Sequence, residues 1–211
     1  VSEKEGMIFD EKGINIKNLI EYKIKNGNIK NFPDGKFIND PNESLFVDCD
    51  ILIPAALENS IIANNVKKIK AKLICEAANG PISWRANKYL VEKNIPVLPD
   101  IFANAGGVAV SYFEWIRNIS HIRLGRMNRR YEENRGREIV NAISQITDKK
   151  ISEKSIQQIV YGAKEEDIVN SGLEDTMRIA FQDIKNLKNE YSLDNYRIAA
   201  YGIAIKKIEK S

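Results

Sequence analysis

Small and amide residues follow three apolar runs of the sequence, and they are its clearest candidates for ligand chemistry. The three segments are Pro54-Ala55-Ala56, Ala78-Asn79-Gly80-Pro81 and Asn104-Ala105-Gly106-Gly107. Small residues let a flat ligand lie against the backbone, and Asn amides can bond ribose hydroxyls or a carboxamide. Asn and Gly also favour ordinary turns, which would explain any single segment. Three such segments in series favour a ligand-binding edge.

Ser111 is a polar residue about one turn inside a helix that is otherwise apolar around it. Glycines at the start of this helix leave backbone N–H groups available to electron-rich ligand atoms. One interpretation makes the Ser111 hydroxyl a donor to a substrate carboxylate. The other is a hydroxyl bonded to its own helix four residues earlier. The nearby aromatic residues Tyr112, Phe113 and Trp115 are interpreted as core and interface packing.

The elements that position these segments alternate between short strands and helices. Apolar runs at 51–53, 71–77 and 95–98 predict strands. Helices are expected over 59–70 and over 83–93, with Ser83 as the N-cap of the second. Short apolar strands separated by helices are typical of a parallel sheet covered on both faces. The predicted fold class is therefore α/β, with a doubly wound parallel sheet.

The second half of the chain is expected to be helical. An amphipathic helix is predicted from about 106 to 119, followed by a basic, polar stretch from 121 to 156 that we interpret as a projecting helical appendage. Two further amphipathic helices are predicted from Glu165 onward. The single His, His121, is expected at the surface or at an interface.

Composition argues against several classes of function. The 32 basic and 29 acidic side chains give a formal net charge of +3, which indicates neither a nucleic-acid nor a membrane partner. The arginines at 123–137 are interleaved with Glu132, Glu133 and Glu138, which further weakens a nucleic-acid interpretation. No apolar run approaches the ~20 residues of a membrane span. Cys49 and Cys75 are expected as buried, reduced thiols, and two Cys with one His predict no metal site.

Three ordered motifs resemble hexameric glutamate dehydrogenase of the animal, antenna-bearing type. They are Asp48-Cys49-Asp50-Ile51-Leu52-Ile53-Pro54-Ala55-Ala56, Ala78-Asn79-Gly80-Pro81 and the segment from Asn104-Ala105-Gly106-Gly107 through Ser111-Tyr112-Phe113-Glu114-Trp115. The likeness extends from Glu3 to the final helix. It implies a Rossmann-like fold, a homo-hexamer, and NAD(P)-dependent oxidative deamination of glutamate to 2-oxoglutarate and ammonia.

The resemblance also implies roles for individual residues. The cofactor is expected to be NAD, with NADP as the alternative, because an acidic Glu3 tolerates a free ribose better than a 2′-phosphate. Within the family pattern, Glu3 contacts the adenosine ribose, Ala55, Ala56 and Asn79 line the dinucleotide cleft, Asn104 contacts the nicotinamide end, and Ser111 binds a substrate carboxylate.

No G-x-G-x-x-G fingerprint occurs in the sequence. The expected Rossmann-like sheet is therefore partial and lacks its first strands and phosphate-binding turn. The resemblance implies that the catalytic Lys and Asp, which would polarise the reacting oxygen and move protons, lie in an N-terminal domain that this sequence does not contain. We expect no catalytic residue here, and no turnover from this chain alone. The alternative is a non-catalytic structural subunit of a larger assembly, derived from a dehydrogenase remnant.

The stretch from about 126 to 163 takes the place of the family's antenna. The resemblance implies a partial NAD(P)-binding domain (1–122), an antenna-like insertion (123–163) and pivot-like C-terminal helices (164–211). Asn170, Ile179 and Gln182 stand where animal members carry a His and arginines, which removes charge from the expected purine-nucleotide effector sites. The implied compartment is the mitochondrial matrix, with the cytoplasm as the alternative.

Overall fold

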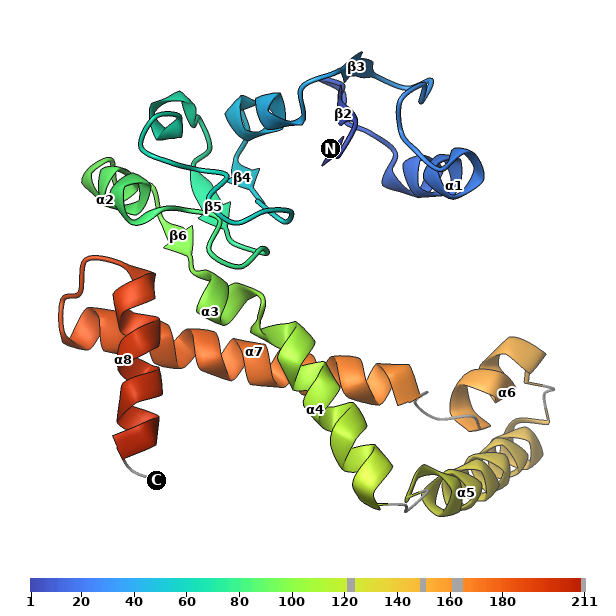
Figure 1. The fold of residues 1–211 in the computed structure, drawn as a ribbon. Helices are drawn as coiled ribbons and strands as arrows, with labels where there is room; N and C mark the ends of the chain where they lie inside the picture. The colour runs from blue at the N-terminus through green and yellow to red at the C-terminus, as the bar shows by residue number, and fades with distance from the viewer. Residues whose placement is uncertain (121–123, 149–150, 161–164, 210–211) are drawn as a thin grey trace. The chain divides into compact units, whose positions relative to one another are not determined.

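The computed structural model of the protein describes residues 1–120, 124–148, 151–160 and 165–209 (Figure 1). The chain divides into two compact units, Val1–Asn104 with Asp183–Ser211, and Ala105–Gln182. The three-part division expected from the sequence, at residues 122 and 163, stays a prediction. His121 lies outside the described residues.

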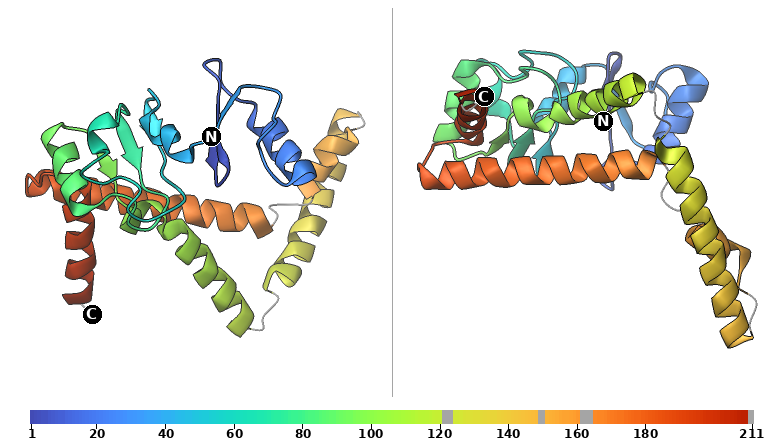
Figure 2. Two further views of the ribbon diagram at one scale, coloured as in Figure 1. Left: turned by 45° about the horizontal axis from the view of Figure 1, so that its top comes forward. Right: turned by 90° about the horizontal axis from the view of Figure 1, so that it is seen from below.

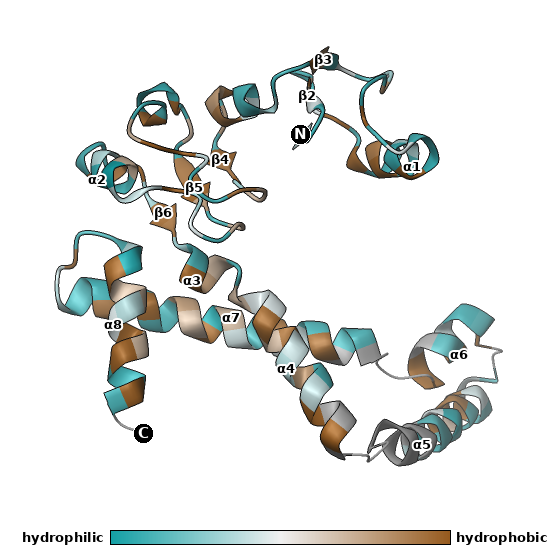
Figure 3. Ribbon diagram, in the orientation of Figure 1, coloured by the Kyte–Doolittle hydropathy of each residue, from teal (hydrophilic) through white to brown (hydrophobic). Residues whose placement is uncertain are grey.

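Three short strands form a parallel sheet in the first unit, in the order β4-β5-β6. Ile51 pairs with Leu73 and Ile74 pairs with Val97, all in parallel register. These strands are among the hydrophobic parts of the chain in Figure 3, and Ile74 is fully buried. The predicted α/β class with a parallel sheet is confirmed. The strands are β4 (Ile51–Leu52), β5 (Leu73–Cys75) and β6 (Val97–Leu98).

Helix α2 (Trp84–Glu92) follows β5 and begins where the sequence predicts. The Ser83 hydroxyl oxygen accepts a hydrogen bond from the backbone N–H of Ala86, which caps the first turn. The helix buries Ala86 and Leu90 completely in the same apolar cluster as Ile74. This burial fixes the helix on the sheet, because it removes the apolar face from water.

The helix predicted over residues 59–70 is wrong. Ile61 forms a parallel bridge with Ile82 instead, and a short 3-10 helix, η2 (Val66–Lys68), follows a turn. The Asn65 side chain accepts the N–H of Ile62 and donates to the carbonyl of Ser60, both at 2.8 Å. This side chain therefore satisfies backbone groups that would otherwise enter a helix, as Asn commonly does in turns.

An antiparallel sheet that the sequence analysis did not anticipate opens the first unit, in the order β1-β2-β3. Gly6 has a φ of +150°, and a Cβ at this position would lie 2.3 Å from the carbonyl oxygen of Ile38. The approach of β2 to β3 there consequently requires glycine. Helix α1 packs on the sheet through a core of Ile8, Leu19, Ile29 and Phe32. The elements are β1 (Ser2–Glu3), β2 (Gly6–Phe9), α1 (Ile16–Asn26), β3 (Lys36–Ile38) and the 3-10 helix η1 (Pro41–Phe46).

Helix α8 (Tyr196–Glu209) completes the first unit. It contacts β6 and the short helix α3 (Asp100–Ala103), which follows β6 directly. Ala199 and Ala200 are buried, and Ile184, near the end of helix α7 (Glu165–Glu190), belongs to the same cluster. Small side chains at this contact bring the backbone of α8 close to its neighbours, so the start of α8 lies beside the end of the parallel sheet.

The described part of the second unit is made of helices α4 (Ala105–Ser120), α5 (Leu124–Thr147), α6 (Glu153–Val160) and most of α7 (Figure 2). The predicted helices beginning near 106 and 165 are confirmed. Tyr112 and Trp115 stack with ring centroids 5.8 Å apart and are more than half exposed, whereas Phe113 is half-buried. Of the three aromatic residues, only Phe113 fits the predicted core packing. Within the described ranges, no helix is long and apolar enough to cross a membrane.

The contact between α5 and α6 depends on Gly136, and we expect Gly136→Ala to weaken it. A Cβ at Gly136 would lie 2.7 Å from the carbonyl oxygen of Ile159 and 2.8 Å from the Cα of Val160, which are backbone atoms. Overpacking of this kind destabilises by about 1–3 kcal/mol. Thermal melting followed by circular dichroism measures the loss.

The matched control is Gly107→Ala in α4, where a Cβ meets nothing within 4 Å. Alanine is the better helix former by roughly 0.5–1 kcal/mol, so this variant is expected to melt at the same or a higher temperature. Equal melting temperatures for the two variants would contradict the packing of α5 on α6.

Candidate functional site

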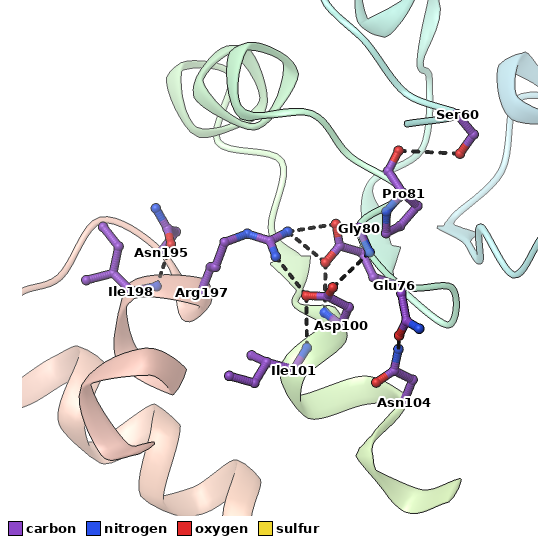
Figure 4. A network of polar contacts seen from close by, with 11 residues as sticks. Ser60, Glu76, Gly80, Pro81, Asp100, Ile101, Asn104, Asn195, Arg197 and Ile198 are labelled. Atoms are coloured by element: carbon purple, nitrogen blue, oxygen red, sulfur yellow. Dashed lines mark hydrogen bonds and ion pairs between the residues drawn. The ribbon is translucent and has the colours of Figure 1, made fainter. Parts of the chain in front are cut away.

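A buried ion cluster joins the carboxyl ends of β5 and β6 to the start of α8 (Figure 4). Glu76 directly follows β5 and is completely buried. Arg197 donates from Nη2 to both Glu76 carboxylate oxygens at 2.7 Å, and from Nη1 to Asp100 Oδ1 at 2.9 Å. A guanidinium that bonds two carboxylates with separate nitrogens fixes both in position as well as in charge.

The same carboxylates hold the backbone of the two segments that follow the strands. The N–H of Asp100 donates to Glu76 Oε2 at 2.7 Å. The N–H of Gly80 donates to Asp100 Oδ2, and the N–H of Ile101 donates to Asp100 Oδ1, both at 2.9 Å. The chain after β5 and the chain after β6 are therefore bound to each other through side-chain oxygens.

Protonation of the two carboxyl groups differs because their surroundings differ. Burial raises the pKa of Glu76, and the bonds from Arg197 and from the Asp100 N–H offset this only in part. Burial also acts to raise the pKa of Asp100, but the N–H groups of Gly80 and Ile101, together with Arg197, lower it below its ordinary value. Asp100 is consequently the firmly ionised member of the cluster.

Asn79 and Asn104 lie together on this framework. Asn104 Nδ2 donates to Asn79 Oδ1 at 2.6 Å. Each amide carries one donor and one acceptor group, so their mutual bond leaves one NH2 and one carbonyl oxygen of the pair available. That remainder is the same whichever way round the two amides are placed. The structure thus brings two predicted site residues into one donor–acceptor pair.

Ala55 and Ala56 follow β4 at the same edge of the sheet. The carbonyl oxygen of Pro54 accepts the N–H of Ala77 at 3.1 Å and the N–H of Ala78 at 2.9 Å. The segment after β4 is therefore tied to the segment after β5. Both alanines are exposed, so they present backbone and methyl groups at this edge.

Glu3 lies in a different sheet from these residues. It ends β1 of the antiparallel sheet, and its carboxylate pairs with the Lys23 ammonium of α1. The described parallel sheet does not include this strand. A ribose contact by Glu3 stays a prediction.

Ser111 belongs to α4 in the second unit, and its hydroxyl donates to the carbonyl oxygen of Gly107 at 2.9 Å. This bond is the helical alternative that the sequence left open. Ser111 is exposed. With its proton bonded to Gly107, the hydroxyl can accept a hydrogen bond through its lone pairs but has no proton left to donate. Donation to a substrate carboxylate would require the hydroxyl to turn away from Gly107.

The two cysteines offer no activated nucleophile. Both are free and half-buried. Burial raises the pKa of the Cys49 thiol, with Asp48 and Asp50 adding to the effect, and burial with Glu76 raises that of Cys75. A raised pKa keeps a thiol protonated at neutral pH, where it reacts slowly. The described residues contain no cluster of His, Cys, Asp and Glu suited to a metal ion.

Sequence reasoning missed Glu76, Asp100 and Arg197. A signal was present for the first two, because each strand of the pair β5 and β6 is followed within two residues by an acidic side chain. An acid inside an apolar run needs a buried partner. Nothing local to Arg197, 121 residues after Glu76, identified it as that partner.

We expect Arg197→Leu to cost about 3–5 kcal/mol of unfolding free energy at about pH 8, because it leaves the Glu76 carboxylate buried without a cation. Losing Arg197 raises the pKa of Glu76 further. A carboxyl group whose folded pKa is raised stabilises the protein below its ordinary pKa and loses that contribution as the pH rises. The deficit relative to the original chain should therefore shrink between about pH 8 and about pH 5, as measured by urea unfolding.

Two further variants test this assignment. Glu76→Gln combined with Arg197→Leu should recover part of the loss, since the fully buried side chain at position 76 is then neutral and the remaining Asp100 carboxylate keeps the N–H groups of Gly80 and Ile101. Arg178→Leu is the matched control, because Arg178 pairs with Asp175 at 2.9 Å on the exposed surface of α7. Its expected cost is below about 1 kcal/mol. A deficit for Arg197→Leu that is equally small would contradict the cluster.

The chain is similar in sequence to curated proteins. The chain is 45% identical over 209 residues to "Glutamate dehydrogenase, mitochondrial" of Dictyostelium discoideum, covering 99% of this chain and 41% of that protein. It is 38% identical over 209 residues to "Probable glutamate dehydrogenase" of Sinorhizobium fredii, covering 99% and 47%. The chain thus spans less than half the length of these relatives.

Solved structures agree in fold. Glutamate dehydrogenase from Peptoniphilus asaccharolyticus is 29% identical with a TM-score of 0.57, covering 96% of this chain and 35% of that one. Hetero-hexameric glutamate dehydrogenase from Thermus thermophilus, in a Leu-bound form, gives a TM-score of 0.71 over 98% of this chain and 39% of that one. At 16% identity the second match shows the fold alone.

A family model completes the comparison. The model described as "Glutamate/Leucine/Phenylalanine/Valine dehydrogenase" matches residues 1–163, which is more than half of the chain. The parallel sheet, whose strands are followed by small and amide segments, fits this match. The chain therefore belongs to the Glutamate/Leucine/Phenylalanine/Valine dehydrogenase family.

Proposed function

We propose that this chain supplies the nicotinamide-facing wall of an NAD-dependent glutamate dehydrogenase, which converts glutamate to 2-oxoglutarate and ammonia. The observation that carries the proposal is the Asn79–Asn104 pair, held at the carboxyl ends of β5 and β6. In open parallel sheets, ligands bind at this edge. Asparagines at both strand ends, on a backbone fixed by buried carboxylates, make it a rigid polar surface.

The chemistry of this pair fits a nicotinamide. Its remaining NH2 and carbonyl oxygen complement a carboxamide, which itself offers one acceptor and one donor. Ala55 and Ala56 add a small, exposed surface over which a flat group can lie. Bound NAD would supply the hydride acceptor for the reaction. The residues of this chain bind and orient the ring and do not themselves transfer protons.

Arg197 serves this function indirectly. Its guanidinium holds Glu76 and Asp100, which hold the backbone at Gly80 and Ile101 next to the two asparagines. Binding surfaces made of side chains already fixed in position lose less conformational entropy when a ligand docks. We therefore assign the cluster a positioning role.

Substrate and cofactor choice rest on Ser111 and Glu3. Ser111 is proposed to bind a substrate carboxylate, and Glu3 is proposed to contact the adenosine ribose. An acidic residue at the ribose favours NAD over NADP, because it repels a 2′-phosphate. A protein of Clostridioides difficile that is 48% identical over 118 residues is named "NAD-specific glutamate dehydrogenase", which supports the same choice.

Assembly and compartment follow from relatives and belong to the proposal. The Thermus thermophilus structure is described as hetero-hexameric and the Dictyostelium discoideum relative as mitochondrial. We propose a hexamer in the mitochondrial matrix, with the α5–α6 pair as the antenna-like insertion. Neither nucleic acid nor a membrane is a proposed partner.

The test is glutamate-dependent reduction of NAD by the natural gene product that carries this chain, with the 211-residue chain assayed beside it. We expect turnover from the natural product and none from the 211 residues alone. The intact mass of the natural product decides between part of a glutamate dehydrogenase and a non-catalytic structural subunit. A stable product of this length, inactive and held in a complex, would establish the structural subunit instead.

Asn104→Ala in the natural product is expected to raise the KM for NAD about tenfold, the equivalent of about 1.4 kcal/mol, because it removes one of the two amides that face the carboxamide. The KM for glutamate should change less. Steady-state kinetics with each substrate varied in turn measure both. Asn31→Ala, at an exposed position in the first unit, is the control and should leave both constants unchanged.

Ser111→Ala should produce the reverse pattern, with the KM for glutamate raised and that for NAD nearly unchanged. The expected rise is about five- to tenfold, since a hydrogen bond to a charged group contributes about 1.5 kcal/mol or less when exposed. Ser111→Thr keeps a hydroxyl and should restore most of the affinity. An unchanged KM for glutamate in Ser111→Ala would leave the hydroxyl with only its bond to Gly107.

A further inference from the structure

A cavity of about 250 Å³ lies within the first unit, and neither Asn79 nor Asn104 lines it. It is bordered by the chain that enters β6, by α2 and by the turn between α7 and α8. Its lining combines polar residues of α2, α7 and α8 with apolar residues. The apolar lining residues are Val91, Ile95, Pro96 and Val97.

Asn87 lines this cavity from α2. The residue is only 6% exposed, and its side chain has no hydrogen-bond partner among the described residues. Its amide atoms are not sealed in the protein interior either, so they face the cavity. A buried amide without a partner costs about 1–3 kcal/mol. The arrangement therefore points to a partner supplied from within the cavity.

The first turn of α8 lines the same cavity with Tyr196 and Arg197. Asn195 caps the helix by accepting the N–H of Ile198 at 3.0 Å. The N–H of Arg197 has no acceptor among the described residues, and Arg197 lines the cavity. The start of a helix carries a partial positive charge that favours anions. At fourteen residues, α8 is long enough to develop it.

Lys188 adds a full positive charge. Its ammonium lies 5.6 Å from the centre of the Tyr196 ring, and no carboxylate among the described residues pairs with it. Asp194 also borders the cavity, but it is exposed, so water and salt screen its charge. The guanidinium of Arg197 is already bonded to Glu76 and Asp100. Arg197 therefore contributes only its backbone to this site.

We propose that this cavity binds a small organic anion, a carboxylate or a phosphate ester with an apolar body. The anionic group bonds the Arg197 N–H, the Lys188 ammonium and the Asn87 NH2, while the body lies against Val91 and Pro96. The volume suits a ligand of a few carbon atoms beyond the anionic group. Because Arg197 also holds Glu76 and Asp100, an occupant of this cavity contacts the residue that positions the nicotinamide-facing segments.

Titration of isovalerate and of inorganic phosphate into the ¹⁵N-labelled 211-residue chain tests this proposal, with ionic strength held constant. We expect saturable shifts of the Arg197 backbone amide and of the Asn87 side-chain NH2. A response to isovalerate alone identifies a carboxylate site, and a response to phosphate alone identifies a phosphate site. This readout does not depend on dehydrogenase activity, so it fails or succeeds independently of the proposed function.

Three variants sharpen the experiment. Lys188→Gln should weaken binding about tenfold, and Asn87→Asp should abolish it by placing a negative charge in the cavity. Asp194→Asn should tighten binding by about two- to threefold, because it removes the one acidic side chain that borders the cavity among the described residues. Lys185→Gln, at an exposed position on α7, is the matched control and should leave the affinity unchanged.

The proposal is overturned if neither anion gives a saturable shift. It is also overturned if the shifts persist equally in Lys188→Gln and Asn87→Asp. Should Asn87→Asp fail to fold, the comparison of Lys188→Gln with Lys185→Gln decides alone, since both replace lysines that form no ion pair among the described residues.

Discussion

The bond between Arg197 and Glu76 is the interaction on which the candidate site depends. Glu76 is fully buried, and an isolated carboxylate in that position would cost several kcal/mol. Arg197 meets both of its oxygens at 2.7 Å and reaches Asp100 with its other nitrogen. Since Asp100 in turn accepts the N–H of Gly80, one guanidinium determines the course of two chain segments.

The ion cluster explains how segments made of small residues can be held in one conformation. Alanine, glycine and asparagine have little side chain with which to fix their own backbone, and glycine has the greatest freedom to lose. The rigidity of these segments must therefore come from other residues. Here it comes from the carboxylates of Glu76 and Asp100, which bond backbone N–H groups directly. The segments held in this way also carry Asn79 and Asn104, whose amides bond each other.

The first unit uses α8 for two purposes. Its buried alanines pack it against neighbouring elements, and its first turn carries Arg197 into the ion cluster. The same turn also lines the cavity near Asn87 and Lys188. A residue that serves both surfaces gives the last helix of the chain a direct connection to the segments after β5 and β6, although it lies far from them in sequence.

Sequence alone determined the features that arise from local chemistry. Apolar runs ending in small and amide residues predicted the parallel strands and the segments that follow them, Ser83 predicted the start of α2, and periodicity predicted α4, α7 and α8. Local patterns gave the wrong structure near Asn65, because its side chain bonds backbone groups that would otherwise enter a helix. They also missed the antiparallel sheet, which depends on Gly6 fitting against Ile38. Only the tertiary structure decided that Arg197 lies beside Glu76. The physical reason is distance along the chain. An acidic residue in an apolar run indicates that a buried charge needs a partner, but only the packed fold determines which distant residue pairs with it.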